Sequence, residues 1–204
     1  MTHPDINSGH MDSQTGKLGM WIFLFTELFL FGGLFLVYAV FRATYSEDFH
    51  KAARELNAFI GTLNTIFLLV SSMTVAMSLT AIQKKQKNLA LFLVLTTLFL
   101  AALFMLNKYF EWSHKFHFKL YPGSEVLKNL ARGELLFFGL YFMMTGLHAL
   151  HVLVGMVLLS INIVKIQTRR ITSQNYLLLE NSALYWHLVD LIWIFLFPLL
   201  YLIT

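Results

Sequence analysis

Long, nearly uninterrupted apolar runs dominate the chain and recur five times, at about residues 18–40, 59–82, 89–106, 135–164 and 176–203. Each run has about the length that a helix needs to cross the hydrocarbon core of a bilayer, roughly 20 residues. None shows the period-two alternation of a membrane β-barrel strand, and only helices satisfy the backbone polar groups of such runs internally. The pattern therefore predicts an all-α, polytopic membrane protein folded as a bundle of five transmembrane helices.

Polar segments separate these runs and set the expected domain organisation. Residues 1–16 are predicted to form a polar N-terminal tail without the basic start and cleavage site of a signal peptide, so we expect the first helix to be retained. Residues 17–204 are predicted to form one membrane domain. Its helices are expected at about residues 18–42, 58–82, 88–112, 133–165 and 176–203.

The composition agrees with a membrane protein and excludes several kinds of site. Hydrophobic residues make up 57% of the chain and charged residues only 13%, whereas soluble domains carry about 25% charged residues. The chain has no cysteine, which excludes disulfides, iron–sulfur clusters and thiolate metal sites. The net charge of +4 comes from basic loop residues, which indicates contact with a lipid surface and not with nucleic acid.

The basic loop residues give a small bias for the orientation in the membrane. Seven Lys and Arg residues fall on each side of the predicted bundle, so the raw count is a tie. The segments 83–88 and 165–174 are shorter and more densely basic than the segments on the other side. Because short basic loops tend to stay in the cytoplasm, we expect a cytoplasmic N-terminus and a C-terminus on the opposite side.

A single carboxyl group lies deep in the first predicted helix. Glu27 is about 14 Å from its start at about 1.5 Å per residue, among phenylalanines and with no cation within a turn. A charge at this depth costs several kcal/mol by most scales. Glu27 is therefore expected to be neutral, or to pair with another helix or a lipid headgroup. A hydrogen bond to a neighbouring helix and a specific lipid or proton role both remain open.

Other ionisable residues lie in the third and fifth predicted helices. Lys108 and Glu111 are three residues apart, on one helical face where they can form an ion pair. The last helix carries Glu180, His187 and Asp190, and the last two are again three residues apart.

The fourth predicted helix carries a stripe of polar residues. Glu134, Tyr141, Thr145 and His148 fall within roughly 60° of one another on a helical wheel. This polar stripe is expected to face protein instead of lipid. His151 lies on an adjacent face of the same helix.

Three imidazoles within predicted helices, His148, His151 and His187, raise the question of a metal site. The sequence H-A-L-H at residues 148–151 is not the H-E-x-x-H of zinc proteases, and a haem-copper centre needs six histidines. A three-histidine metal site is conceivable. We favour buried histidines that hydrogen-bond across helices to Glu or Asp, with a lipid-headgroup contact as the alternative, and expect neither catalytic nor metal-binding residues in this chain.

Four segments, in the same order along the chain, resemble subunit III of the haem-copper oxidases in its bacterial five-helix form. They are KLGMWIFLFTELFLFGGLF (17–35), KYFEW (108–112), TGLHALHVLVG (145–155) and YWHLVDLIWIFLFPLLYL (185–202). The resemblance extends from about residue 17 to the end of the sequence.

The resemblance implies a subunit with no catalytic centre and no cofactor of its own, the haem and copper being held by the partner catalytic subunit. It further implies packing on oxidase subunit I and other oxidase subunits, phospholipid binding, and support of proton uptake and stable turnover in aerobic electron transport. The expected location is a bacterial inner (plasma) membrane. The candidate lipid-binding or proton-related residues are Glu27, His148, His151 and Glu134. The expected structural buried polar residues are Lys108, Glu111, His187, Asp190 and Glu180.

Three alternatives remain open from the sequence. An accessory subunit of a quinol oxidase or a nitric oxide reductase would resemble the same family, so the electron donor is not determined. A stand-alone proton channel or transporter could use Glu27, His148 and Asp190 as a relay, although the repeats and broken helices of many transporters are not visible in the sequence. A membrane metalloenzyme would use the three helical histidines.

Overall fold

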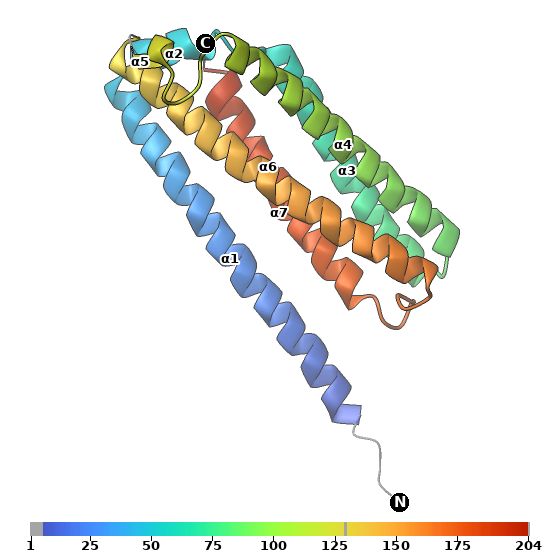
Figure 1. Cartoon of the computed structure of the whole chain (residues 1–204). Coiled ribbons are helices and arrows are strands. Elements are labelled where there is room, and N and C mark those ends of the chain that lie inside the picture. The colour runs from blue at the N-terminus through green and yellow to red at the C-terminus, as the bar shows by residue number, and fades with distance from the viewer. Residues whose placement is uncertain (1–5, 129, 204) are drawn as a thin grey trace, which may run out of the picture.

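The computed structural model describes residues 6–128 and 130–203, and these form helices and short connections without any strand. The long helices are α1 (Ile6–Thr44), α3 (Ala58–Gln83), α4 (Lys87–His117), α6 (Arg132–Gln167) and α7 (Leu177–Tyr201). Two short helices, α2 (Ser46–Ala53) and α5 (Glu125–Lys128), lie together at one end of the bundle (Figure 1). Each long helix contains a stretch long and apolar enough to span a membrane. The predicted all-α fold with five spans is confirmed.

The helices extend further than the apolar runs suggest. α1 begins at Ile6, so part of the polar segment expected as a tail continues the first helix. The connection between the first two spans, which carries charges of both signs, contains α2 in place of a simple loop. The division between a tail and a membrane domain at residue 17 stays a prediction.

Local signals set several helix ends. The side chain of Asn57 accepts the first backbone N–H groups of α3 at 3.0 and 3.3 Å, as an N-cap residue does. The helices α3, α4 and α6 are each followed by a residue in the left-handed region, where glycine is more usual. These residues are Lys85 (φ 61°), Lys119 (φ 55°) and Arg169 (φ 56°). Each places a positive residue at the negative end of a helix dipole.

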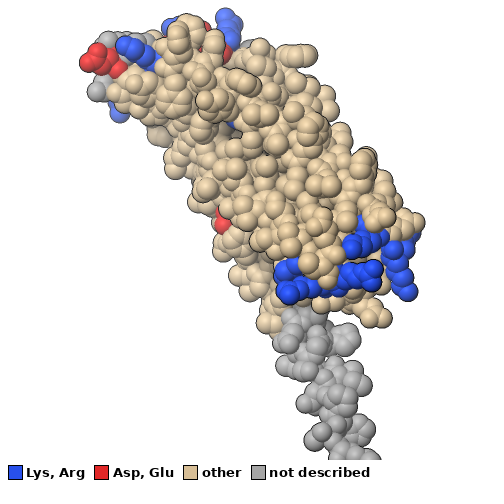
Figure 2. All heavy atoms as spheres, turned by 45° about the vertical axis from the view of Figure 1, so that its right-hand side comes forward, with Lys and Arg blue, Asp and Glu red and all other residues tan. Residues whose placement is uncertain are grey.

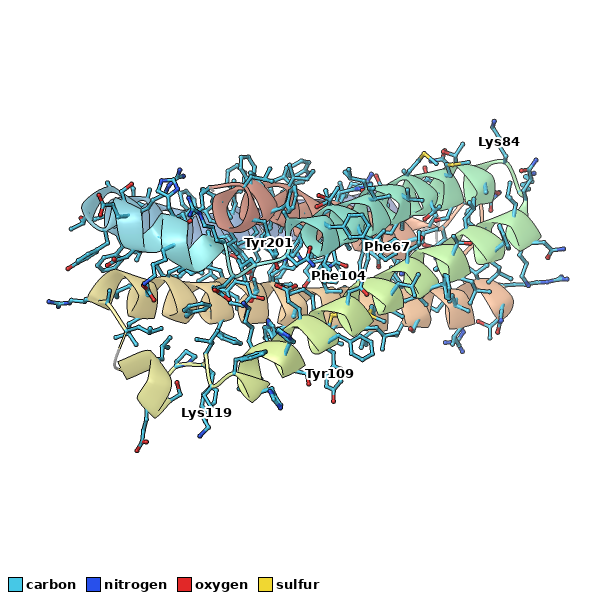
Figure 3. The ribbon with its side chains drawn as sticks, turned by 90° about the horizontal axis from the view of Figure 1, so that it is seen from above. Phe67, Lys84, Phe104, Tyr109, Lys119 and Tyr201 are labelled. Atoms are coloured by element: carbon cyan, nitrogen blue, oxygen red, sulfur yellow. The ribbon has the colours of Figure 1, made fainter. Side chains whose placement is uncertain are left out.

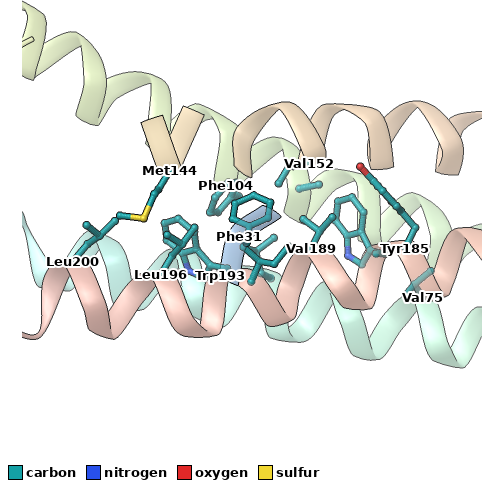
Figure 4. Close-up of a cluster of buried hydrophobic side chains, with 14 of the residues drawn as sticks. Phe31, Val75, Phe104, Met144, Val152, Tyr185, Val189, Trp193, Leu196 and Leu200 are labelled. Atoms are coloured by element: carbon teal, nitrogen blue, oxygen red, sulfur yellow. The ribbon is translucent and has the colours of Figure 1, made fainter. Parts of the chain in front are cut away.

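α7 forms the centre of the bundle. Half of its most apolar 18-residue stretch is buried inside the chain, compared with 17% of the corresponding stretch of α1. Its fully buried Trp193 packs edge-on against Phe104 of α4, with ring centroids 4.9 Å apart (Figure 4). The indole N–H groups of Trp186 and Trp193 donate to Ser71 and Thr65 of α3, both at 3.0 Å. The two largest core residues of α7 therefore also have satisfied polar atoms.

Small residues allow the closest helix contacts. A Cβ atom on Gly155 of α6 would lie 2.7 and 2.8 Å from two ring carbons of Trp186. A Cβ atom on Gly61 of α3 would lie 2.8 Å from the ring of Phe197. α7 can therefore approach α6 and α3 closely only because these positions lack a side chain.

α1 lies along one side of the bundle, next to α6 and α7 (Figure 1). Most of its large apolar side chains point away from the other helices, for example Phe29 at 76% exposure and Leu36 at 68%. Apolar surface of this extent requires lipid or another protein chain to cover it. The chain is therefore a multi-pass membrane protein whose first span is its least buried one.

Candidate functional site

Glu27 and His151 form an ion-pair contact between α1 and α6. The Oε2 atom of Glu27 lies 2.8 Å from Nε2 of His151. Their side chains keep 15% and 11% of their exposure, so the pair lies at the edge of the bundle and not in its centre. The ring of Phe31 packs edge-on against the imidazole with centroids 5.3 Å apart, and Tyr185 stacks on it at 6.5 Å. The acid for which the sequence indicated no partner is thus bound to the second imidazole of the H-A-L-H segment.

The other imidazole nitrogen of His151 determines how many protons this pair holds. Nδ1 lies 2.7 Å from the backbone carbonyl oxygen of Leu147. Because a carbonyl oxygen can only accept, Nδ1 must carry a hydrogen. Between Nε2 and Glu27 there is then room for one proton, either on the carboxyl group or on the ring. Both arrangements leave the pair neutral overall, which is compatible with its depth in the membrane.

His148, three residues earlier, has entirely different surroundings. It is fully buried, and neither ring nitrogen has a hydrogen-bond partner among the described residues. Phe104 packs edge-on against it with centroids 5.6 Å apart, and Trp193 lies at 5.2 Å. The imidazole is therefore enclosed by aromatic rings inside the bundle, whereas Glu27 and His151 keep a partly exposed edge.

Glu134 lies at one end of the bundle, in the first turn of α6. It is about 25 Å from His151 along the helix, at about 1.5 Å per residue. Its Oε1 atom accepts from Lys51 of α2 at 2.5 Å. This hydrogen bond raises the pKa of Lys51. The stabilisation that comes from the lysine charge is therefore present at neutral pH and is lost as the pH rises through that raised pKa. Beside it, Asp48 accepts the backbone N–H of Gly133 at 3.0 Å and caps α6.

The four residues predicted as one lipid-binding or proton-related group therefore occupy three separate places. Glu27 and His151 meet at the α1–α6 edge, His148 lies in the core, and Glu134 binds Lys51 at the end of the bundle. Glu134, Tyr141, Thr145 and His148 are all buried, as expected for a stripe that faces protein.

Lys108 and Glu111 form the most completely bonded polar cluster. Lys108 Nζ lies 3.2 Å from Glu111 Oε2, 3.3 Å from the Tyr141 hydroxyl and 2.9 Å from the Tyr201 hydroxyl. Both phenols donate to Glu111 Oε1, at 2.6 and 2.5 Å. The four residues, 0–8% exposed, join α4, α6 and α7. The lysine ammonium group thus has three acceptors, and Glu111 receives a donor on each oxygen.

The remaining predicted structural residues fall into different environments. Glu180 pairs with Lys17 of α1 at 2.9 Å, partly exposed. His187 does not bond Asp190; its Nδ1 lies 2.6 Å from the hydroxyl of Ser72 on α3. The buried carboxyl of Asp190 has no hydrogen-bond partner of acceptable geometry among the described residues, although the Ser72 hydroxyl lies near it.

The sequence did not indicate the partners in several of these contacts. Tyr201 of α7 carried no pattern that set it apart. The small and polar residues Ser72 and Thr65 indicated close packing of α3 with other helices, but not which side chain each one meets. The hydrogen bond of 2.9 Å between Asn64 of α3 and Asn107 of α4 was not predicted either, although Asn64 itself favoured a packed bundle. An asparagine inside an apolar run is the one signal that could have found it, because such an amide needs a partner across helices.

No group of three His, Cys, Asp or Glu side chains is placed to hold a metal ion within residues 6–128 and 130–203. His148 is enclosed by rings, His151 is engaged by Glu27 and the Leu147 carbonyl, and His187 is engaged by Ser72. A three-histidine centre is therefore not formed in the part of the chain that is described. That the chain binds neither haem nor metal stays a prediction.

Comparison with known proteins gives consistent matches over nearly the whole chain. The sequence model of the family described as cytochrome c oxidase subunit III matches residues 7–204. Cytochrome c oxidase subunit 3 of Rhipicephalus sanguineus is 33% identical over 193 residues, covering 91% of this chain and 69% of that protein. A protein named probable quinol oxidase subunit 3 from Staphylococcus epidermidis is 29% identical over 200 residues, 97% of this chain and 94% of the relative.

A third relative is similar to a comparable degree. Cytochrome bo(3) ubiquinol oxidase subunit 3 of Buchnera aphidicola is 30% identical over 188 residues, covering 90% of this chain and 92% of that protein. The resemblance deduced from four sequence segments is thus confirmed independently by the family match. The chain belongs to the cytochrome c oxidase subunit III family of the haem-copper oxidases, which includes subunits of both cytochrome c and quinol oxidases.

Proposed function

We propose that this chain is a non-catalytic subunit of a respiratory oxidase in a bacterial plasma membrane, where it packs on the catalytic subunit, binds phospholipid and supports proton uptake and stable turnover. The single observation that carries the proton-related part is the Glu27–His151 pair, 2.8 Å apart at the edge of the bundle. Haem and copper would belong to the catalytic subunit, and this chain would contribute no reacting group.

The proton count of this pair supports a role in proton supply. Because one proton is shared by Glu27 and His151, it can move between them without leaving a net charge in the membrane. The partial exposure of both side chains leaves the pair accessible from one side. A second group on a lipid or a neighbouring subunit could therefore exchange a proton with it.

The exposed apolar face of α1 supports the proposed packing. Only 17% of its most apolar 18-residue stretch is buried within the chain, and Glu27 lies on this helix. A catalytic subunit or tightly held lipids covering α1 would bury this surface and would bring their own polar groups next to Glu27.

The alternatives differ in how well the contacts support them. A stand-alone relay through Glu27, His148 and Asp190 is not favoured, because His148 and Asp190 have no hydrogen-bond partners among the described residues. Cytochrome c and quinol both remain candidate electron donors, since relatives of both names have similar identity. An accessory subunit of a nitric oxide reductase remains the further alternative within this family.

A mild-detergent purification of the tagged full chain tests the proposed assembly. We expect haem absorption in the visible spectrum of the co-purified material, together with the catalytic subunit in stoichiometric amount. Recovery of the chain alone, without haem-containing partners, from membranes that retain oxidase activity would contradict the proposal.

Glu27→Gln in the assembled complex is expected to leave haem content and subunit stoichiometry unchanged, because the amide can donate to Nε2 of His151. The amide cannot carry the shared proton, so activity should decline faster over many turnovers. Glu27→Leu leaves Nε2 without a partner and should cost about 1–3 kcal/mol in stability. Oxidase activity over successive turnovers, with Glu47→Gln as a control for an exposed acid, measures the effect. Loss of haem in Glu27→Gln would tie the residue to cofactor insertion and contradict the proposed role.

The orientation proposed from the basic loops can be tested separately. The chain has no cysteine, so Gln86→Cys provides a single label in the exposed turn between α3 and α4. With a cytoplasmic N-terminus, this turn also faces the cytoplasm, and an impermeant thiol reagent should label it only after the membrane is opened. Equal labelling of intact cells would reverse the proposed orientation.

A further inference from the structure

The end of the bundle formed by the α3–α4 turn and the α6–α7 loop is strongly basic. Residues 83–88 and 165–176 contain six Lys and Arg residues and no Asp or Glu. Figure 2 shows these positive side chains gathered at one end, whereas positive and negative side chains mix at the other. The opposite end carries Glu47, Asp48, Glu55 and Glu125 among its basic residues.

A pocket of about 270 Å³ lies in this basic end, between the turn and the loop. Three buried isoleucines, Ile82, Ile166 and Ile171, line its apolar part, at 0–6% exposure. The hydroxyl-bearing residues Thr172 and Ser173 line it on the loop side. The rest of the lining is basic: Lys85, Lys87 and Arg169.

The backbone fixes where Lys85 and Arg169 leave the two helix ends, and a hydrogen bond holds Lys87 between them. Lys85 and Arg169 both occupy left-handed positions just after α3 and α6. Lys87 Nζ donates to the carbonyl oxygen of Gln167 at 2.9 Å and so ties the start of α4 to the end of α6. No carboxylate forms an ion pair with Lys85, Lys87 or Arg169 within the described ranges. The positive charge is therefore concentrated around the pocket and is not neutralised by a carboxylate of the described chain.

We propose that this pocket binds the phosphate-bearing headgroup of an anionic phospholipid from the leaflet at this end of the bundle. The phosphate would lie among Lys85, Lys87 and Arg169, and the first carbons of the acyl chains would contact the exposed edges of Ile82 and Ile171. An apolar floor beside a cluster of unpaired cations at the end of the membrane spans complements an amphiphile with a negative head. This inference rests on the proposed phospholipid binding and specifies the headgroup and its site. It does not depend on the proposed proton role of Glu27 and His151, so the turnover test of Glu27→Gln and the lipid-retention test can fail separately.

The left-handed backbone provides variants that remove charge without disturbing the fold. Glycine adopts a positive φ more easily than Lys or Arg, so Lys85→Gly and Arg169→Gly should keep both helix ends intact. The full chain, purified with its associated subunits, is placed in nanodiscs of phosphatidylglycerol and phosphatidylcholine. Native mass spectrometry then measures how much phosphatidylglycerol is retained after partial delipidation. Retention should fall roughly fivefold for each charge removed and about 25-fold in the double variant.

Two matched controls separate a site from general surface charge. Lys84 lies at the same end but does not line the pocket, so Lys84→Gln removes only a nearby charge. Lys119 also has a positive φ, so Lys119→Gly makes the same backbone change at the opposite end. Figure 3 shows Lys84 and Lys119 at opposite ends of the molecule. Both should retain phosphatidylglycerol as the unmodified chain does. Equal losses of phosphatidylglycerol in Lys84→Gln and Lys85→Gly would show that the lipid is held by general surface charge and not by this pocket, and would overturn the proposal. Displacement of the lipid by inorganic phosphate at matched ionic strength would assign the pocket to a free anion and also overturn it.

Discussion

Glu111→Gln is expected to destabilise the chain by about 3–5 kcal/mol, because it leaves the buried Lys108 ammonium group without a negative partner. Lys108 is 3% exposed, and its three polar contacts all lie inside the bundle. Lys108→Met should have an effect of similar size, since it leaves the carboxylate of Glu111 uncompensated. The measurement is loss of tertiary structure of the purified chain on heating or in rising denaturant, followed by tryptophan fluorescence.

The double variant Lys108→Met, Glu111→Gln distinguishes an ion pair from two independent core residues. The amide oxygen that replaces the carboxylate of Glu111 would still accept from Tyr141 and Tyr201, and no unpaired charge would remain. We expect the double variant to recover at least half of the stability lost in either single variant. Simple addition of the two losses would show that the pair is not coupled.

The partly exposed pair Lys17–Glu180 is the matched control. Its atoms are 2.9 Å apart, closer than the 3.2 Å of Lys108 and Glu111, but its side chains are 44% and 26% exposed. Exposed pairs contribute about 0–1 kcal/mol, so Glu180→Gln should change the stability far less than Glu111→Gln. Equal effects of the two substitutions would mean that burial does not decide the cost.

Gly155→Ala is expected to destabilise the bundle by about 1–3 kcal/mol through overpacking. The new Cβ atom would lie 2.7 and 2.8 Å from ring carbons of Trp186, which is fully buried and held by Ser71. The indole cannot move away without breaking that hydrogen bond. Accumulation in membranes and thermal stability of the purified chain measure the effect.

Gly139→Ala in the same helix is the control for the substitution itself. A Cβ atom there meets nothing within 4 Å, and alanine favours a helix over glycine by about 1 kcal/mol. The two changes should therefore have opposite signs. A loss of stability in Gly139→Ala as large as that in Gly155→Ala would indicate that helix packing does not explain the effect at Gly155.

The sequence was sufficient to predict the five spans, because hydropathy over about 20 residues is a direct consequence of bilayer thickness. It also placed Lys108 next to Glu111 correctly, since a spacing of three residues fixes neighbours within one helix. The stripe of Glu134, Tyr141, Thr145 and His148 was expected to face protein and does so.

The hydrophobic and polar pattern of the sequence did not predict which residues of different helices contact each other. Glu27 and His151 are 124 residues apart, and nothing in either helix specifies that these two residues meet. The two imidazoles of the H-A-L-H segment looked equivalent in the sequence. They point about 60° apart around the helix axis, which is enough to place His151 towards α1 and His148 towards Phe104 and Trp193. Tyr201 was likewise missed because one tyrosine in an apolar helix gives no sign of its partner.

The polar contacts of α1 have a consequence for its vertical position in the membrane. α1 buries only a small part of its apolar surface in the bundle, so packing alone fixes its register weakly. Polar contacts of α1 with the bundle include Lys17 with Glu180, Glu27 with His151, and the Tyr38 hydroxyl with the carbonyl of Leu199. A slip of one helical turn, about 5.4 Å, would separate all three pairs at once. These contacts therefore set the depth of the least buried helix, and the loss of one should let α1 shift along the membrane normal before it detaches from the bundle.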